Sequence, residues 1–249
     1  MQIHIRSTGS QERWVWTQGL QTLGQQEIAV MAPWPEGDPR DRLLAHLLRF
    51  LEQYLSSQPK RILPGQILRY GWTLLRFVAD EQNRSGAGTD ALLIEEMQDP
   101  FAQGAPSYIS GVARILALLQ VQHEAMRRNT ITGDAIYPHR SQRAMVCTRV
   151  TPETVQRLRP LRADRAWRPD VQDSGWFLGC CDREHDHDDP DELGMIHLFH
   201  LVERFPGLFP YLAMPVGTML LFEESRAIVF RPGEDEGQID PASLFTSLP

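Results

Sequence analysis

The sequence predicts an α+β protein of two small domains, each with a mixed or antiparallel sheet packed with helices. The 249 residues suffice for two domains of ordinary size. Each half contains short strand-like runs and a run with the apolar spacing of a helix. A Gly- and Pro-containing stretch over 133–141 separates the halves. We therefore expect an N-terminal α+β domain at 1–139, a second domain at 140–232 and an acidic tail at 233–249.

Strands of the first domain are predicted from short apolar or alternating runs. They are expected at 3–5, 14–16, 27–31, 67–70, 73–78 and 91–97. The first helix should follow a Pro-containing loop, with Asp38 or Asp41 as its N-cap and Pro59 after its end. Leu residues recur at helical spacing within it and favour a core face over an interface. These are Leu43, Leu44, Leu47, Leu48, Leu51 and Leu55. A second helix is predicted over 109–128.

The second domain has its own set of predicted elements. Strands are expected at 144–150, 176–178, 219–222 and 227–230, the last two as a hairpin. Thr151 and Pro152 can open a short helix as N-cap and first helical residue. A further helix is predicted to begin at Asp191. The residues from Pro232 onward are acidic and contain Gly and Pro, so we expect the tail to be poorly packed.

The composition limits the classes of function. A net charge of −7 argues against a nucleic-acid-binding surface as the first expectation. No uncharged apolar run of about 18 residues exists, so no transmembrane helix is expected. The start, MQIHIRSTGS, lacks the regions of a signal peptide. The three cysteines, Cys147, Cys180 and Cys181, are expected to form neither a disulfide framework nor a zinc site. A reduced, cytoplasmic compartment fits best.

The most densely specified stretch of the chain runs from Trp176 to Gly217. It combines a Gly-Trp strand, an acidic D-D-P-D loop, a leucine before a proline, and a P-V-G turn ahead of a last strand. The residues are Gly175, Trp176, Asp188, Asp189, Pro190, Asp191, Leu212, Pro215, Val216 and Gly217. In this order and spacing they resemble immunity protein family 33, a small bacterial domain of polymorphic toxin systems. The resemblance covers roughly 140–232 and departs from the family pattern at 185–187, where a Tyr-Leu or similar pair is usual.

The resemblance implies a cytosolic antitoxin that binds one cognate protein toxin, without a catalytic residue, cofactor or metal. The acidic loop 182–192 holds seven acidic residues and one Arg, and so many carboxylates repel one another unless water or a cationic partner screens them. Its toxin-binding candidates are Asp182, Glu184, Asp186, Asp188, Asp189, Asp191 and Glu192. Five Arg residues over 157–168 form the second candidate contact. The two segments could also neutralise one another or be solvated.

An enzymatic alternative rests on the loop from His185 to Asp189. Its H-x-H-x-D pattern resembles the start of the metal motif of metallo-β-lactamase-like hydrolases, in which side chains converge on zinc. Pro190 stands where the last His is expected, and His197 and His200 follow too soon to be the downstream ligands. The chain has no phosphate-binding glycine loop and no G-x-S-x-G elbow. We therefore predict a binding protein, with a metal-dependent hydrolase as the alternative.

Overall fold

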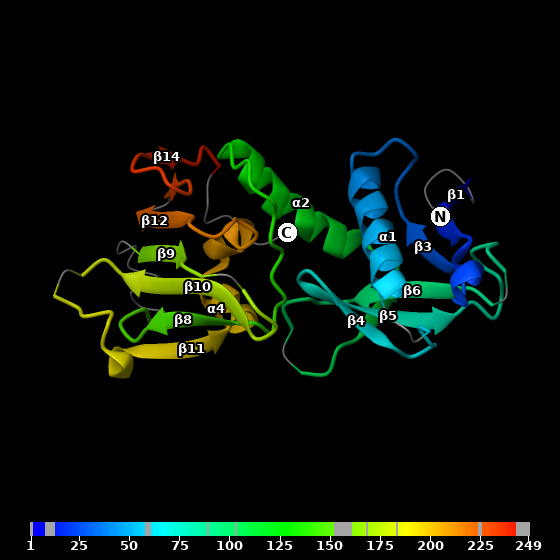
Figure 1. Cartoon of the computed structure of the whole chain (residues 1–249), viewed down its shortest axis with the longest axis horizontal. Coiled ribbons are helices and arrows are strands. Elements are labelled where there is room, and N and C mark those ends of the chain that lie inside the picture. Colours follow the sequence, from blue (N-terminus) through cyan, green and yellow to red (C-terminus); the bar gives the residue numbers. More distant parts are fainter. Residues whose placement is uncertain are drawn as a thin grey trace. The chain divides into compact units, whose positions relative to one another are not determined.

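The computed structural model describes residues 2–7, 13–57, 61–88, 90–102, 104–151, 161–167, 169–182, 184–223 and 226–242. Its internal contacts divide the chain into two units, Met1–Gln120 and Val121–Pro249. The division falls within helix α2 (Ala113–Arg128), upstream of the stretch at 133–141. Each unit contains a mixed sheet with helices (Figure 1), so the predicted α+β class is confirmed.

The first unit is built on a seven-stranded sheet. Its strands lie in the order β1-β2-β3-β6-β5-β4, with β7 also paired to β6. Only β3 and β6 run parallel; the other neighbours are antiparallel. The bounds are β1 Gln2–Ser7, β2 Arg13–Gln18, β3 Ile28–Ala32, β4 Ile67–Tyr70, β5 Thr73–Ala79, β6 Leu92–Met97 and β7 Tyr108–Ser110. The strands predicted for this half are therefore present, and β7 is additional.

Helix α1 (Arg40–Ser57) supplies the core with the predicted leucine stripe. Five of its leucines are at most 3% exposed, which confirms the core face. They are Leu44, Leu47, Leu48, Leu51 and Leu55. The helix begins at Arg40, so neither Asp38 nor Asp41 is its N-cap as predicted. Both carboxylates nevertheless bind backbone near the helix start: Asp38 accepts from the N–H of Arg40, and Asp41 from that of Gly37. The burial of apolar surface along one stripe, rather than intrinsic propensity alone, therefore fixes this helix.

Helix α2 begins later than predicted, at Ala113 rather than 109. Residues Tyr108–Ser110 form β7 instead, and Gly111, at φ +97°, makes the turn into the helix. A Cβ at Gly111 would lie 2.8 Å from the carbonyl oxygen of Met31, so only glycine fits there. The buried carboxylate of Glu96 accepts hydrogen bonds from the first free N–H groups of the helix, at 2.9 Å and 2.8 Å. Burial outweighs these bonds and raises the pKa of Glu96 to about 7.

The second unit has a seven-stranded sheet in the order β11-β8-β10-β9-β12-β13-β14. The bounds are β8 Arg143–Cys147, β9 Leu161–Arg165, β10 Asp173–Cys180, β11 Leu193–His197, β12 Met219–Glu223, β13 Arg226–Phe230 and β14 Gly237–Ile239. Only β8 and β10 are parallel, so their carboxyl ends meet at the same edge of the sheet. The predicted hairpin is confirmed as β12 and β13.

Helix α4 (Leu198–Arg204) and the 3-10 helix η3 (Pro206–Tyr211) supply the other half of this core. The buried side chains of this segment include Leu201 in α4, Phe205 between the two helices and Tyr211 in η3. The rings of Phe205 and Tyr211 contact that of Phe222 on β12, with centroids 4.7 Å and 5.9 Å apart and edge-to-face geometry. The helical layer is thus packed directly on the sheet.

The prediction of a helix beginning at Asp191 is wrong. Pro190–Glu192 form only a 3-10 turn, η2, and β11 follows before α4 begins at Leu198. Gly194 is a poor helix former, and the edge of β8 provides backbone partners for all five residues of β11. Strand β9 was not predicted, because its Arg-rich sequence hides an inward alternation of Leu161, Ala163 and Arg165. The short helix predicted after Thr151 lies outside the described residues.

The tail is better packed than predicted. Strand β14 pairs with β13, and Asp240 after it is only 3% exposed. The Asp240 carboxylate accepts hydrogen bonds from Arg128, Asn129 and Tyr211. These bonds outweigh desolvation and lower the pKa of Asp240 below its usual range. The expectation of a loosely packed tail is therefore wrong at Asp240, whereas the residues of β14 are paired with β13 but remain exposed.

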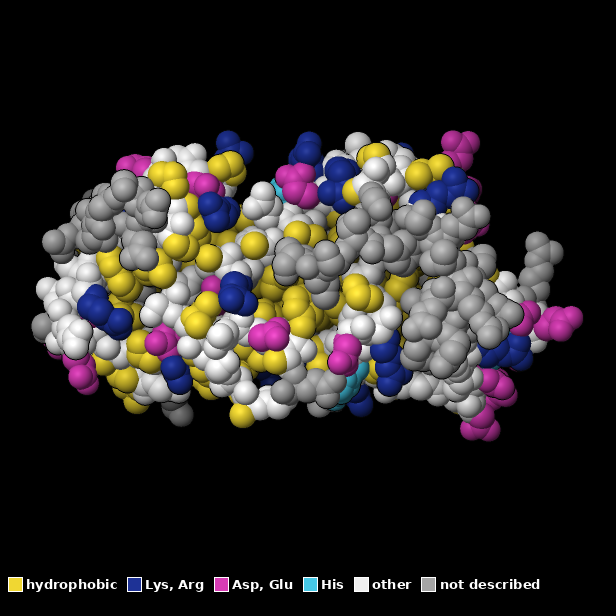
Figure 2. Space-filling view, turned by 180° about the vertical axis from the view of Figure 1, so that it is seen from behind, with side chains coloured by type: hydrophobic (Ala, Val, Ile, Leu, Met, Phe, Trp, Pro, Cys, Tyr) yellow, Lys and Arg dark blue, Asp and Glu magenta, His cyan; other side chains and the backbone are white. Residues whose placement is uncertain are grey.

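The surface carries charges of both signs. On the face seen in Figure 2, acidic and basic side chains of the described residues are interspersed. No helix among the described residues is long and apolar enough to cross a bilayer.

Candidate functional site

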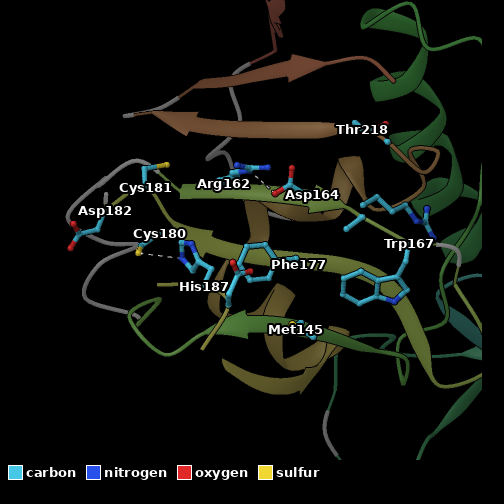
Figure 3. A pocket seen from close by; sticks show the side chains of 14 residues that line it. Met145, Arg162, Asp164, Trp167, Phe177, Cys180, Cys181, Asp182, His187 and Thr218 are labelled. Carbon is cyan, nitrogen blue, oxygen red and sulfur yellow. Dashed lines mark hydrogen bonds and ion pairs between the residues drawn. The ribbon is translucent and has the colours of Figure 1, made fainter. Parts of the chain in front are cut away.

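A pocket of about 710 Å³ opens on the outer face of the second sheet. Its floor is made by side chains that alternate with the core residues of β8, β9 and β10, namely Met145, Arg162, Asp164 and Phe177. Trp167 and Thr218 lie at one end and Cys180, Cys181, Asp182 and His187 at the other (Figure 3). The pocket thus joins the strand face to the acidic loop.

The opposite face of the same strands is core, and it contains Trp176. This residue is 1% exposed, as predicted for an inward strand position, and its indole N–H donates to the Leu212 carbonyl at 3.1 Å. Gly175 precedes it at φ +76°, where a Cβ would lie 2.1 Å from the Trp167 carbonyl oxygen. The Gly-Trp pair therefore combines a backbone position that only glycine can occupy with the largest core side chain of β10.

The acidic loop is mostly exposed, and the structure does not gather its carboxylates into one cluster. Asp182 and Asp188 border the pocket, while Glu184, Asp186, Asp189 and Asp191 are exposed outside it and Glu192 is half-buried. Local contacts hold the loop. Asp182 pairs with Arg149 at 2.6 Å, and Glu192 accepts from the Thr148 hydroxyl at 2.6 Å. The pKa of Asp182 is lowered mainly by a hydrogen bond from the Glu184 N–H and further by Arg149. The pKa of Glu192 is lowered mainly by the Thr148 hydroxyl.

Asp189 has a structural role within the loop. It is the N-cap of η2, and its carboxylate accepts from the N–H of Asp191 at 3.0 Å. Pro190 follows at the first helical position, where its missing N–H costs nothing. The D-D-P-D motif is therefore, at this residue, a capping motif.

Of the five arginines predicted as the second contact, the structure describes Arg162 and Arg165, and only Arg162 is exposed. Arg165 is fully buried and donates from one nitrogen, Nη1, to three backbone carbonyls, those of Ile136, Leu212 and Met214. Burial lowers its pKa to about 10. Arg162 is exposed and paired with Asp164 at 2.6 Å. Arg157, Arg159 and Arg168 lie outside the described residues.

Four side chains that the sequence analysis did not connect lie together at the carboxyl ends of β8 and β10. They are Cys147, Cys180, His185 and His187, and one donor atom from each lies within 4.8 Å of all the others. The Cys147 and Cys180 sulfurs are 3.8 Å apart, and His185 Nε2 is 3.1 Å from the Cys147 sulfur. Burial raises the pKa of the Cys180 thiol and lowers that of His187. Cys181 is exposed outside the group.

The sequence contained a signal for this group. Cys147 and Cys180 each end an apolar run, and two histidines follow Cys180 within seven residues. The sequence did not indicate that β8 and β10 pair in parallel. This pairing brings together Cys147 and Cys180, which are 33 positions apart in the chain. The other histidine pair, His197 and His200, does not share a helix: His197 ends β11 and His200 lies in α4, with ring centroids 6.5 Å apart.

The fold and the site define a small mixed-sheet domain with a capped acidic loop after a Gly-Trp strand. Residues 122–231 match the family model of the Imm33-like domain. The match begins next to the start of the second unit at Val121 and confirms the resemblance that the sequence suggested. Searches of the curated proteins and of the solved structures gave no significant match.

Proposed function

We propose that this protein is an immunity protein that binds and neutralises one cognate bacterial toxin in the cytoplasm, without acting as an enzyme. The observation that carries the proposal is the match of residues 122–231 to the Imm33-like domain. We propose a protein as the partner, and neither nucleic acid nor a membrane. The net charge of −7 is compatible with a cationic toxin surface.

The acidic loop is the proposed contact. Six of its seven carboxylates are exposed, and hydrogen bonds from Thr148 and Arg149 hold both ends of the loop against the strand edge. A loop fixed on a rigid scaffold can present charge without a large ordering cost on binding. Carboxylates in this arrangement can occupy a cationic active site in place of phosphates.

A metal-dependent hydrolase fits the site less well. The imidazoles of His185 and His187 face the thiols of Cys147 and Cys180. Among the described side chains, no third histidine of the kind that the hydrolase motif requires joins them, and Pro190 holds that place as the first residue of η2.

The test begins with the genes next to the one for this chain. Each neighbour is expressed in a bacterial host alone and together with this protein. We expect one neighbour to be toxic alone, to be neutralised by co-expression, and to bind the purified chain stoichiometrically. If no neighbour is both toxic and neutralised, the proposed function is wrong.

The contact is then tested with two matched double variants in the second unit. Asp186→Asn with Asp188→Asn removes two loop charges, and Asp235→Asn with Glu236→Gln removes two exposed charges elsewhere. In the native loop the backbone N–H of Asp188 donates to the Asp186 carboxylate, and an Asn at position 186 keeps an oxygen that can accept this bond. Asp189 is left intact because it caps η2. We expect only the loop variant to slow association with the toxin and to flatten its salt dependence. Equal rates for both variants would exclude the loop as the contact.

A further inference from the structure

The thiols and imidazoles at the ends of β8 and β10 have the donor set of a structural metal centre. Two Cys and two His are the ligands of many four-coordinate zinc sites. The four donor atoms are Sγ of Cys147, Sγ of Cys180 and a ring nitrogen each of His185 and His187. We propose that Cys147, Cys180, His185 and His187 bind one Zn²⁺ ion.

The distances between the donors support this assignment. Zinc bonds of about 2.3 Å to sulfur and about 2.0–2.1 Å to nitrogen place tetrahedral donors about 3.8 Å apart for two sulfurs and about 3.5 Å apart for sulfur and nitrogen. The Cys147 and Cys180 sulfurs are 3.8 Å apart. The sulfur-to-Nε2 distances are 3.1 Å for Cys147 with His185 and 3.7 Å for Cys180 with His187. These three distances lie within a few tenths of an ångström of the tetrahedral values, and all the donor atoms lie within 4.8 Å of one another.

The surroundings of the ligands fit the same role. Both histidines turn Nε2 toward the thiols. On the far side of the ring, Nδ1 of His185 lies 3.9 Å from the carboxylate of Glu192, which is longer than a hydrogen bond but places an acidic group on the side of the ring away from the thiols. Glu192 is itself fixed by the Thr148 hydroxyl at 2.6 Å. At Gly179, a Cβ would lie 3.2 Å from Nε2 of His187, so the absence of a side chain leaves room for this ring.

The site is accessible but coordinatively closed. Cys147 and His185 are buried, whereas Cys180 and His187 border the pocket and give an ion a path from solvent. Four protein ligands leave no position for a reactive water, which is the arrangement of structural rather than catalytic zinc. Because two ligands are strand ends and two are in the loop 182–192, the ion clamps that loop to the sheet. Soft thiolates with imidazoles favour Zn²⁺ over Mg²⁺ or Ca²⁺.

The first experiment is elemental analysis of the full-length protein, purified under reducing conditions without chelator. We expect about one zinc per chain, since a closed four-ligand site binds one ion. After chelation, addition of Co²⁺ should give the intense visible bands of tetrahedral cobalt and a thiolate-to-metal charge-transfer band in the ultraviolet. Metal removal should also lower the melting temperature.

Matched variants separate the proposed ligands from their neighbours. Cys180→Ser and His187→Ala should abolish zinc retention and the charge-transfer band, whereas Cys181→Ser and His200→Ala should keep both. Circular dichroism shows whether each variant is folded. If Cys180→Ser does not fold, the unaltered chain still tests the proposal. Its cobalt spectrum shows whether thiolates bind the metal, and titration of its free thiols with and without metal shows whether metal protects them.

Three results would overturn the proposal. One is a reduced, folded protein that holds no zinc and gives no cobalt charge-transfer band. Another is equal loss of metal in Cys180→Ser and Cys181→Ser. The third is an intact mass showing a disulfide between Cys147 and Cys180 in protein purified under reducing conditions.

Discussion

Replacing Trp176 by Ala tests whether the Gly-Trp strand is organised around its core side chain. The indole is 1% exposed, and its N–H donates to the Leu212 carbonyl. Truncation of a buried Trp to Ala leaves a cavity and costs about 3–5 kcal/mol of unfolding free energy. This is a large share of the ~5–15 kcal/mol by which a domain is stable, so Trp176→Ala should unfold at much lower urea concentration or aggregate.

Two further variants make the reasoning specific. In Trp176→Phe the Leu212 carbonyl keeps a second donor, Arg165 Nη1 at 3.1 Å, so the cost should be only about 1–2 kcal/mol. Trp167→Ala is the matched control, because Trp167 is half-exposed at the pocket, and it should cost about 1 kcal/mol or less.

The assay is urea unfolding followed by far-ultraviolet circular dichroism, with the free energy extrapolated to water. The expected order of cost is Trp176→Ala, then Trp176→Phe, then Trp167→Ala. A Trp176→Ala variant as stable as the original chain would refute the packing argument and would make Trp176 a candidate interface residue instead.

Two other predictions concern buried charges. Arg165→Met should destabilise the second unit, because the carbonyls of Ile136 and Met214 lose the Arg165 donor. The expected cost is about 1–3 kcal/mol of unfolding free energy for each buried group left unpaired. A variant that is as stable in urea as the original chain would contradict this role of Arg165. The pKa of Glu96 is raised to about 7 in the folded state, so the folded state holds this proton more tightly than the unfolded state does. The stabilisation is complete below about pH 4.3, the unfolded value, and roughly 3 kcal/mol is lost as the pH rises to about 7. Glu96→Gln should lack this slope in urea unfolding measured over the same range, and parallel pH profiles for the two proteins would contradict the argument.

The sequence predicted the elements whose apolar pattern faces the core. The leucine stripe of α1 and the β12–β13 hairpin were found because burial repeats with the period of the element. Strand β9 was missed because Arg165 takes an inward position where an apolar residue is the ordinary choice. Strand β11 was missed because it is extended through pairing with the edge of β8. That pairing is a tertiary contact, which the local sequence does not indicate.

The candidate sites show the same limit. The acidic loop is contiguous in sequence, so its charges could be counted, and Asp189 could be suspected as a cap from the proline after it. The thiol and imidazole group depends on two strand ends that meet only through parallel pairing. Spacing rules for metal ligands apply within one loop or helix, and on that basis the three cysteines, Cys147 among them, were expected to form no zinc site. The proposed centre at Cys147, Cys180, His185 and His187 departs from that expectation.

The buried carboxylate of Asp240 determines how short a fragment of this protein can be and still fold. The family match ends at residue 231, but the partners of Asp240 lie within the matched segment, at Arg128, Asn129 and Tyr211. A fragment that stops at the end of the match would leave a tyrosine hydroxyl and an arginine without their acceptor in the interior. At the other end, Gln122 donates from α2 to the Phe209 carbonyl at 3.2 Å, so a fragment starting at 140 would lose that anchor too. The smallest piece expected to fold therefore includes Gln122, the first residue of the family match, and ends after Asp240, beyond the last residue of that match.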